Sequence, residues 1–144
     1  MIDVRPYAPG DIMDIDVQAM QTGELGANLF RRLRTRRPGG VSWTVRNRAG
    51  AVICCAGILP AWDGMGQAWA AIGKPRRAEW GALVRLARHK IDRHAPRRLQ
   101  AQAMLAHGGA CRLLEKLGFV CETPDGMACY RGGDAYALYA RIRP

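Results

Sequence analysis

The stretch between residues 67 and 105 restricts the possible folds more than any other part of this sequence. Residues 67–73, QAWAAIG, are small or apolar at nearly every position, which predicts a central strand covered on both faces. Residues 78–95 predict the longest helix, and residues 97–105 alternate apolar and polar side chains as a strand does. The apolar stripe of that helix is Trp80, Leu83, Val84, Ala87 and Ile91. Strand, helix and strand in this order predict a parallel βαβ unit.

Segments on both sides of this unit predict a sheet that is otherwise antiparallel. The further predicted strands are residues 1–7, 41–45, 51–59, 127–131 and 135–142. The further predicted helices are residues 9–20 with Asp11 as N-cap, 24–36, and 109–117 with Gly118 at the C-cap. We therefore expect one α/β (α+β) domain over residues 1–144, with a mostly antiparallel mixed sheet of six to seven strands and about four helices.

Length and cysteine content narrow the class of protein. A chain of 144 residues is long enough to bury one core, and no stretch approaches the roughly 20 apolar residues of a membrane helix. Five cysteines without a CxxC pair favour neither a disulfide framework nor a structural metal site. The first residues also lack a signal-peptide pattern, so we expect a cytoplasmic protein.

The net charge of +10 comes from nineteen arginines and three lysines against twelve acidic residues. The densest cluster is RRLRTRR, residues 31–37. It is either a solvated basic face, with the arginine excess reflecting a GC-rich genome, or a functional patch that attracts polyanions. No helix-turn-helix or RNP motif accompanies the charge, so nucleic-acid binding rests on charge alone.

Residues 107–119, HGGACRLLEKLGF, resemble the NxxAxxLYxxxGF pattern of the GNAT superfamily of acyl-CoA-dependent N-acetyltransferases. The matching residues are Ala110, Leu113, Gly118 and Phe119. The order of predicted elements and the closing two strands are similar to that family as well. The resemblance implies a GNAT-like fold, acetyl-CoA as the acyl donor, no metal, and an amine on a small molecule or a protein as acceptor.

A narrower resemblance points to a second function. Residues 55–73 are similar to a segment of short GNAT-like proteins of tailed phages, related to an internal virion protein of T7-type phages. It implies a catalytically degenerate protein with a structural, scaffolding or virion-associated role, phage structural proteins as partners, and a location in the host cytoplasm or the phage particle.

The GNAT resemblance places the pyrophosphate of the cofactor at the start of the helix over residues 78–95. Amide groups and the helix dipole bind phosphate at such a position. The implied cofactor-binding residues are Ile72, Gly73, Lys74, Arg76, Arg77, Ala78 and Gly81. The chain departs from the family pattern [QR]xxGx[GA], since Pro75, Ala78 and Trp80 stand at its three defined positions. Helical periodicity predicts that Trp80 packs into the core, and the three cations either bind phosphate or are simply exposed.

The usual catalytic groups are not matched. Leu114 stands where the family often has a tyrosine acid, and the strand before the turn offers Gln67 in place of a glutamate base. His107, at the Asn position of the motif, is a candidate base or proton relay, and the alternative is a loop or capping residue. Tyr130 is a candidate hydroxyl donor, and the alternative is a packing role. Cys111 is interpreted as a buried, inert thiol.

Residues 60–66, PAWDGMG, predict a loop between two strands. Trp62 and Asp63 in this loop are candidates for a mobile lip beside the acceptor. The alternatives are an interaction hot spot and a plain connection with Trp62 against the sheet.

Overall fold

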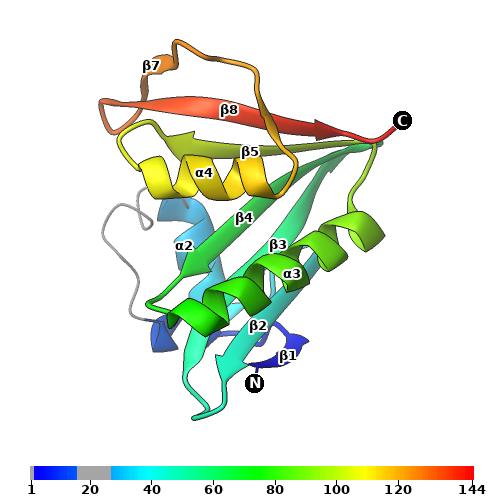
Figure 1. Ribbon diagram of the computed structural model, residues 1–144, viewed down its shortest axis with the longest axis vertical. Helices are drawn as coiled ribbons and strands as arrows, with labels where there is room; N and C mark the ends of the chain where they lie inside the picture. The colour runs from blue at the N-terminus through cyan, green and yellow to red at the C-terminus, as the bar shows by residue number, and fades with distance from the viewer. Residues whose placement is uncertain (1, 16–26) are drawn as a thin grey trace.

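The computed structural model describes residues 2–15 and 27–144, which form one mixed sheet with helices on both faces (Figure 1). The strands are β1 (Ile2–Pro6), β2 (Val41–Asn47), β3 (Val52–Trp62), β4 (Met65–Ile72), β5 (Arg98–Met104), β6 (Val120–Cys121), β7 (Met127–Arg131) and β8 (Asp134–Ile142). Their order in the sheet is β1-β2-β3-β4-β5-β8-β6, with β7 also paired to β8. The predicted α/β class is confirmed, and the eighth strand is β6, which directly follows the helix end at Gly118.

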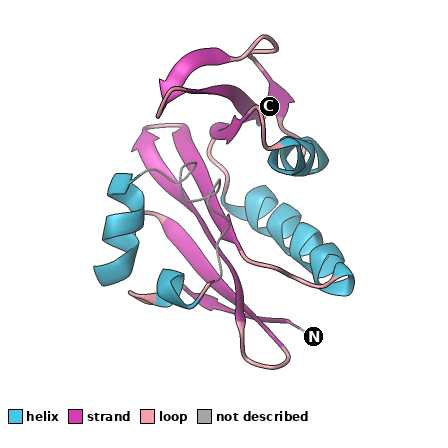
Figure 2. Ribbon diagram, turned by 90° about the vertical axis from the view of Figure 1, so that its left-hand side faces the viewer, coloured by secondary structure: helices cyan, strands magenta, loops and turns pink. Residues whose placement is uncertain are grey.

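The described helices lie on both faces of the sheet (Figure 2). The described helices are the 3-10 helix η1 (Asp11–Asp14), α2 (Ala27–Thr35), α3 (Arg77–His94) and α4 (Gly108–Lys116). Figure 2 shows η1 and α2 on one face and α3 and α4 on the other. The apolar face of α2 buries Leu29 and Leu33 against β3 and β4, while Ile91 of α3 and Phe119 belong to the core on the opposite face.

The prediction for residues 9–20 is wrong in its first part, and residues 16–26 lie outside the described chain. Only a 3-10 turn forms at Asp11–Asp14, and its N-cap is Gly10 rather than Asp11. The Asp11 carboxylate turns toward the sheet instead, where its Oδ2 accepts hydrogen bonds from the Thr44 hydroxyl at 2.6 Å and the Ala8 amide at 3.0 Å. A buried carboxylate needs such donors, and this requirement outweighs a capping role.

The predicted βαβ unit is confirmed as β4-α3-β5, with β4 and β5 parallel. Only three residue pairs join the two strands, and the last pair is Gln67 opposite Gln100. Figure 1 shows β4 and β5 diverging from this point. Just beyond it, the Gln67 amide donates from Nε2 to Oε1 of Gln102 at 3.1 Å, so a side-chain bond crosses the fork where the main-chain ladder ends.

The loop predicted over residues 60–66 is wrong, because β3 and β4 continue through it. Their pairing runs to Trp62 opposite Met65, which leaves Asp63 and Gly64 as a tight turn. Gly64 has a φ of 81°, a conformation that glycine adopts without strain, and its carbonyl accepts the Arg98 amide at 2.9 Å. Asp63 and Gly64 occupy the two central positions of a two-residue hairpin turn, so residues 60–66 can join β3 to β4 without a longer loop.

The helix end at Gly118 forms as predicted. Gly118 has a φ of 90°, and its amide donates to the Glu115 carbonyl at 3.1 Å. The next amide, of Phe119, donates to the Leu114 carbonyl at 3.0 Å, which completes a Schellman motif. Phe119 is 4% exposed, so the turn delivers its ring directly into the core under α4.

A buried tyrosine joins η1, α2 and β1. The Tyr7 hydroxyl donates to the Leu33 carbonyl and accepts the Ile12 amide at 3.2 Å. Its ring packs edge-on against Trp69 of β4, with the ring centroids 6.2 Å apart. The hydroxyl therefore satisfies the Ile12 amide and gives a second hydrogen bond to the Leu33 carbonyl, which also accepts the Gly10 amide at 3.0 Å.

We expect Tyr7→Phe to lower the free energy of unfolding by about 1–2 kcal/mol, because the Ile12 amide loses its partner and the Leu33 carbonyl keeps only the Gly10 amide. Urea unfolding followed by circular dichroism measures the change. Tyr130→Phe is the matched control, since Tyr130 is 42% exposed, and we expect a change within about 0.5 kcal/mol. Equal changes in the two variants would show that the buried hydroxyl contributes nothing specific.

Two adjacent thiols of β3 predict a loss of stability at high pH. Burial raises the pKa of Cys54 and of Cys55 from 9.0 to about 12. The unfolded chain therefore releases these protons at a lower pH than the folded chain. The stabilisation is complete below about pH 9 and is lost as the pH rises toward 12, by at most about 1.4 kcal/mol per pH unit for each thiol.

Urea unfolding under reducing conditions between about pH 8 and 11 tests this expectation. Cys54→Ala should flatten the fall in stability, while Cys129→Ala should leave its slope unchanged because Cys129 is exposed. An unchanged slope in Cys54→Ala would contradict the assignment of the effect to this thiol.

Candidate functional site

The fork between β4 and β5 organises the candidate site. β4 ends at Ile72 and leads into α3, and β5 ends at Met104 and leads into α4. Figure 1 shows both helices beginning at the open end of the fork, on the same face of the sheet. Ligands bind preferentially beyond the carboxyl ends of parallel strands, where helix N-termini converge.

The turn between β4 and α3 leaves few amides for a ligand. The Gly73 amide donates to the Ile53 carbonyl at 2.9 Å, and Pro75 has no amide hydrogen. The first bond within α3 runs from the Trp80 amide to the Arg76 carbonyl at 2.9 Å. The amides of Arg77, Ala78 and Glu79 precede that bond, so they have no acceptor within the helix. Of the expected cofactor-binding set, Arg77 and Ala78 are therefore the residues whose amides are placed to receive an anion.

A carboxylate already occupies part of this helix terminus. Oε1 of Glu79 accepts the Arg76 amide at 2.8 Å, which caps α3 with a negative charge. The helix dipole stabilises that charge, and a bound diphosphate would have to share the terminus with it. The sequence analysis missed Glu79. Its position in the sequence could have indicated this cap. Glu79 lies three residues after Arg76, the N-cap residue of α3, and this is the spacing of a capping box.

Positive side chains surround the same turn. Lys74, Arg76 and Arg77 are exposed, and neither arginine has an acidic partner among the residues described. Together with Glu79 they give the turn a net positive charge. Gly81 lies on α3 beyond the open amides, where its missing side chain adjoins only the Arg85 guanidinium. Cations of this kind, rather than a glycine nest, surround the turn.

The predicted packing of Trp80 into the core is wrong, because its side chain is 38% exposed. The buried side chains at this end of α3 are Ala82 and Leu83. Trp80 lies about 160° around the helix from Ala82 but only about 60° from Leu83, so it lies at the margin of the buried face and is partly exposed. An exposed indole therefore stands beside the open amides of the turn.

His107 and Tyr130 lie on the β5 side of the fork. His107 is the N-cap of α4, and its carbonyl accepts the Ala110 amide at 3.0 Å. Tyr130 of β7 packs on Tyr136 of β8, with ring centroids 5.5 Å apart. Tyr136 pairs with Met104, the last residue of β5, so β8 separates Tyr130 from the fork. His107 therefore lies at the end of β5, at the open end of the fork, and Tyr130 lies beyond β8.

The underside of α4 is apolar apart from one hydroxyl. Leu114 and Cys111 pack against the core under α4. Tyr139 of β8 supplies the hydroxyl in this layer, at 3.5 Å from Oε2 of Glu115, and burial raises its pKa above the usual range. A tyrosine thus lies under α4, but it comes from β8 instead of position 114, and the sequence analysis had no signal that placed it there.

Trp62 and Asp63 lie at the closed end of the fork. They precede β4, whose eight residues separate them from Ile72 by about 25 Å of strand. The Trp62 side chain is 70% exposed, so it is not tucked against the sheet. The two residues are therefore not placed beside the cofactor turn.

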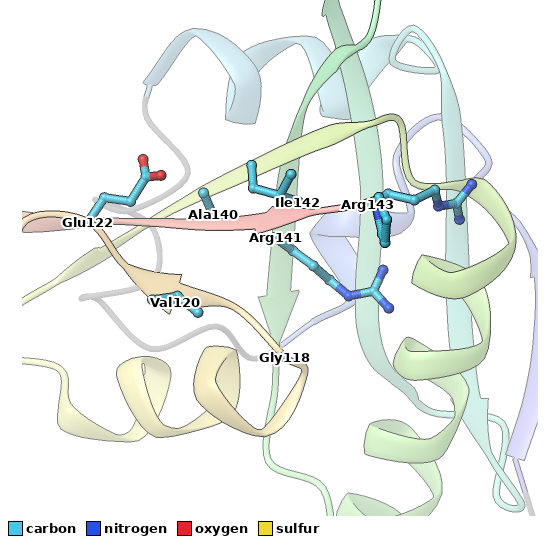
Figure 3. Close-up of a pocket in the computed structure, with 8 residues that line it drawn as sticks. Gly118, Val120, Glu122, Ala140, Arg141, Ile142 and Arg143 are labelled. Atoms are coloured by element: carbon cyan, nitrogen blue, oxygen red, sulfur yellow. The ribbon is translucent and has the colours of Figure 1, made fainter.

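A separate hollow of about 490 Å³ lies at the sheet edge formed by β6 and the end of β8 (Figure 3). Figure 3 shows Arg141 and Ile142 pointing to opposite sides of β8. Of its charged side chains, Glu122 binds Arg98 and Arg141 binds Asp92, while Arg143 donates to the Asp92 carbonyl. The hollow is distant in the sheet from the fork's open end.

Two further findings concern only residues 2–15 and 27–144. They hold no group of three or more His, Cys, Asp or Glu side chains placed to bind a metal ion. No helix in this part of the chain combines the length and apolar character that crossing a bilayer requires.

The sequence matches no protein-family model and no curated protein. Solved structures nevertheless resemble the whole chain. An acetyltransferase from Acinetobacter baylyi aligns with a TM-score of 0.72 at 14% identity, over 99% of this chain and 93% of its own. A candidate phosphinothricin N-acetyltransferase aligns with a TM-score of 0.70 at 14% identity, over 100% and 99% of the two chains.

A spermidine N-acetyltransferase from Vibrio cholerae, solved in complex with CoA and spermine, aligns with a TM-score of 0.71 at 10% identity, over 98% of this chain and 95% of its own. These three give no support to the phage resemblance of residues 55–73, which stays a prediction. The likeness over the full length establishes the architecture: this chain has the fold of the GCN5-related N-acetyltransferases.

Proposed function

We propose that this protein binds an acyl-CoA, with acetyl-CoA as the expected donor, in the fork between β4 and β5 and transfers the acyl group to an amine. The observation that carries the proposal is the end of the β4–β5 ladder at Gln67 and Gln100, with the open amides of α3 directly after β4. Structures of the same fold include an enzyme solved with CoA and spermine, which supports this choice of donor and acceptor class.

The residues present fit the diphosphate of such a donor in part. The amides of Arg77 and Ala78 would receive phosphate oxygens, and the side chains of Lys74, Arg76 and Arg77 would supply positive charge. Glu79 opposes this binding, because its carboxylate caps the same helix end. We therefore expect weaker donor binding than a glycine-lined turn provides.

The reaction requires the amine nitrogen to attack the thioester carbonyl carbon. A carbon–nitrogen bond forms, the carbon–sulfur bond breaks, the amine loses a proton, and the thiol of CoA leaves with one. Neither Gln67 nor Leu114 can move a proton. We propose His107 as the base, since it is the titratable side chain at the end of β5, with the Tyr130 hydroxyl as the second candidate.

One observation favours a second candidate function, a GNAT-fold protein without catalysis. Glu79 places a negative charge where a diphosphate would bind, and apolar packing surrounds Leu114 where many relatives are expected to have an acid. In that case the framework would serve a structural or scaffolding role, for which the phage resemblance supplies the context.

Calorimetric titration with CoA and acetyl-CoA tests donor binding. We expect Arg76→Ala combined with Arg77→Ala to weaken binding more than tenfold through lost charge-assisted hydrogen bonds. We expect Glu79→Gln to strengthen binding about two- to fivefold, because it removes a negative charge at the helix terminus. Asp3→Asn, which removes an acidic charge on β1, is the control and should leave the affinity unchanged. No heat from the wild type at millimolar ligand would favour the non-catalytic candidate.

His107→Asn tests the proposed base while keeping a side chain that can cap α4. We expect the rate of CoA release in the presence of an amine to fall by about 100-fold or more, with donor affinity unchanged. His89→Asn on the exposed face of α3 is the control. Equal rates for wild type and His107→Asn would restrict His107 to its capping role.

A further inference from the structure

The exposed face of α2 carries a cluster of arginines that we call the α2 arginine face. Its members are Arg31, Arg32 and Arg34 of α2 and Arg36, which follows the helix end at Thr35. All four are exposed, and the described residues offer none of them an acidic partner. Arg76 and Arg77 likewise lack an acidic partner among the described residues, whereas Arg141 pairs with Asp92 and Arg98 with Glu122. The α2 arginine face differs from these positions in the density of its charges, four arginines within six residues.

Packing of α2 holds this face in place. Leu29 and Leu33 anchor the opposite side of the helix in the core, with 8% and 0% of their side chains exposed. The Arg36 amide continues the helical bonding to the Arg32 carbonyl at 2.8 Å, and Nε of Arg37 donates to the Tyr7 carbonyl at 3.0 Å. The four guanidinium groups thus project from a fixed support.

The spacing of the four arginines joins their charges into one field. Arg31 and Arg34 are three residues apart, and Arg32 and Arg36 are four apart, so each pair lies about 5–6 Å apart at Cβ. This is shorter than the screening length of about 8 Å at physiological salt. A ligand that meets one member of the face also interacts with the others.

A hollow next to these charges can receive part of a ligand. Met13 of η1, Arg31, Arg34 and Thr35 line a depression of about 430 Å³ between η1 and α2. Two guanidinium forks and a threonine hydroxyl are the groups that proteins direct at phosphate oxygens. Met13 is 56% exposed and adds an apolar surface beside them. The combination suits a phosphate that is attached to a less polar sugar or base.

We propose that the α2 arginine face is a binding surface for nucleic acid, which it contacts through the phosphate backbone without reading sequence. The charge complementarity of four closely spaced arginines, without acidic partners among residues 2–15 and 27–144, and a repeating phosphate chain carries this assignment. The surface lies on the face of the sheet opposite α3, away from the turn at which we propose donor binding (Figure 2). It is therefore separable from the proposed acyl transfer and does not depend on it.

Fluorescence anisotropy with labelled single-stranded and double-stranded oligonucleotides of about 20 nucleotides, at several salt concentrations, tests the proposal. The test variant changes Arg31, Arg32, Arg34 and Arg36 to Gln. The matched control changes Arg48, Arg85, Arg93 and Arg97 to Gln, which removes the same charge from exposed positions elsewhere. For the test variant we expect affinity to fall at least tenfold and the slope of log affinity against log salt to lose about 3 units. The control variant should keep most of the affinity and most of the salt dependence.

Three results would overturn the proposal. The first is no binding by the wild type at low salt, and the second is an equal loss in test and control variants, which would show attraction by net charge alone. The third is displacement of the oligonucleotide by polyglutamate at equal charge, which would identify an acidic protein surface as the better partner. If the fourfold variant does not fold, Arg31→Gln with Arg34→Gln, compared with Arg31→Lys and Arg34→Lys, applies the same test at the hollow.

Discussion

The short ladder between β4 and β5 is the constraint on which the rest of the architecture depends. β4 and β5 are parallel strands joined by only three residue pairs, and beyond these pairs they diverge. We call the two diverging strands the arms of the fork: β4 leads into α3, and β5 leads into α4. Trp69 and Ala71 of β4 join the core under η1 and α2, whereas Leu99 and Ala101 of β5 join the core under α3 and α4. Ala68 of β4 also packs against the core under α3 and α4, so β4 contributes to both cores and β5 to one.

Glycine allows the β4 arm to keep its large side chain. A Cβ on Gly57 of β3 would lie 2.7 Å from Nε1 of Trp69 and 2.6 Å from the Val41 carbonyl. The indole therefore lies flat over a position where no other residue fits, and its ring meets Tyr7 edge-on. The hydroxyl of Tyr7 connects η1 to α2 by hydrogen bonds, and its ring contacts Trp69 of β4. Tyr7 therefore links these helices to the strand that leads into the candidate site.

The same arm leads into a turn that differs from the glycine-lined turn of the pattern the sequence resembles. Three cations and one capping carboxylate surround this turn, whose remaining amides are few. Charge attracts phosphate at a distance but orients it less strictly than a nest of amides does. This combination of a shared fold and a charged turn is the physical basis on which both proposed functions rest.

Local periodicity and turn chemistry in the sequence by themselves determined the βαβ unit, the hairpin of β2 and β3, the α/β class and the helix end at Gly118. These features depend on residues close together in the chain. Tertiary contacts decided the rest. The carboxylate of Asp11 accepts a hydrogen bond from Thr44 of a distant strand, β3 and β4 continue their pairing as far as Trp62 and Met65, and Trp80 is 38% exposed. The fork likewise depends on where β4 loses its partner, which the packing of whole elements sets and periodicity does not encode.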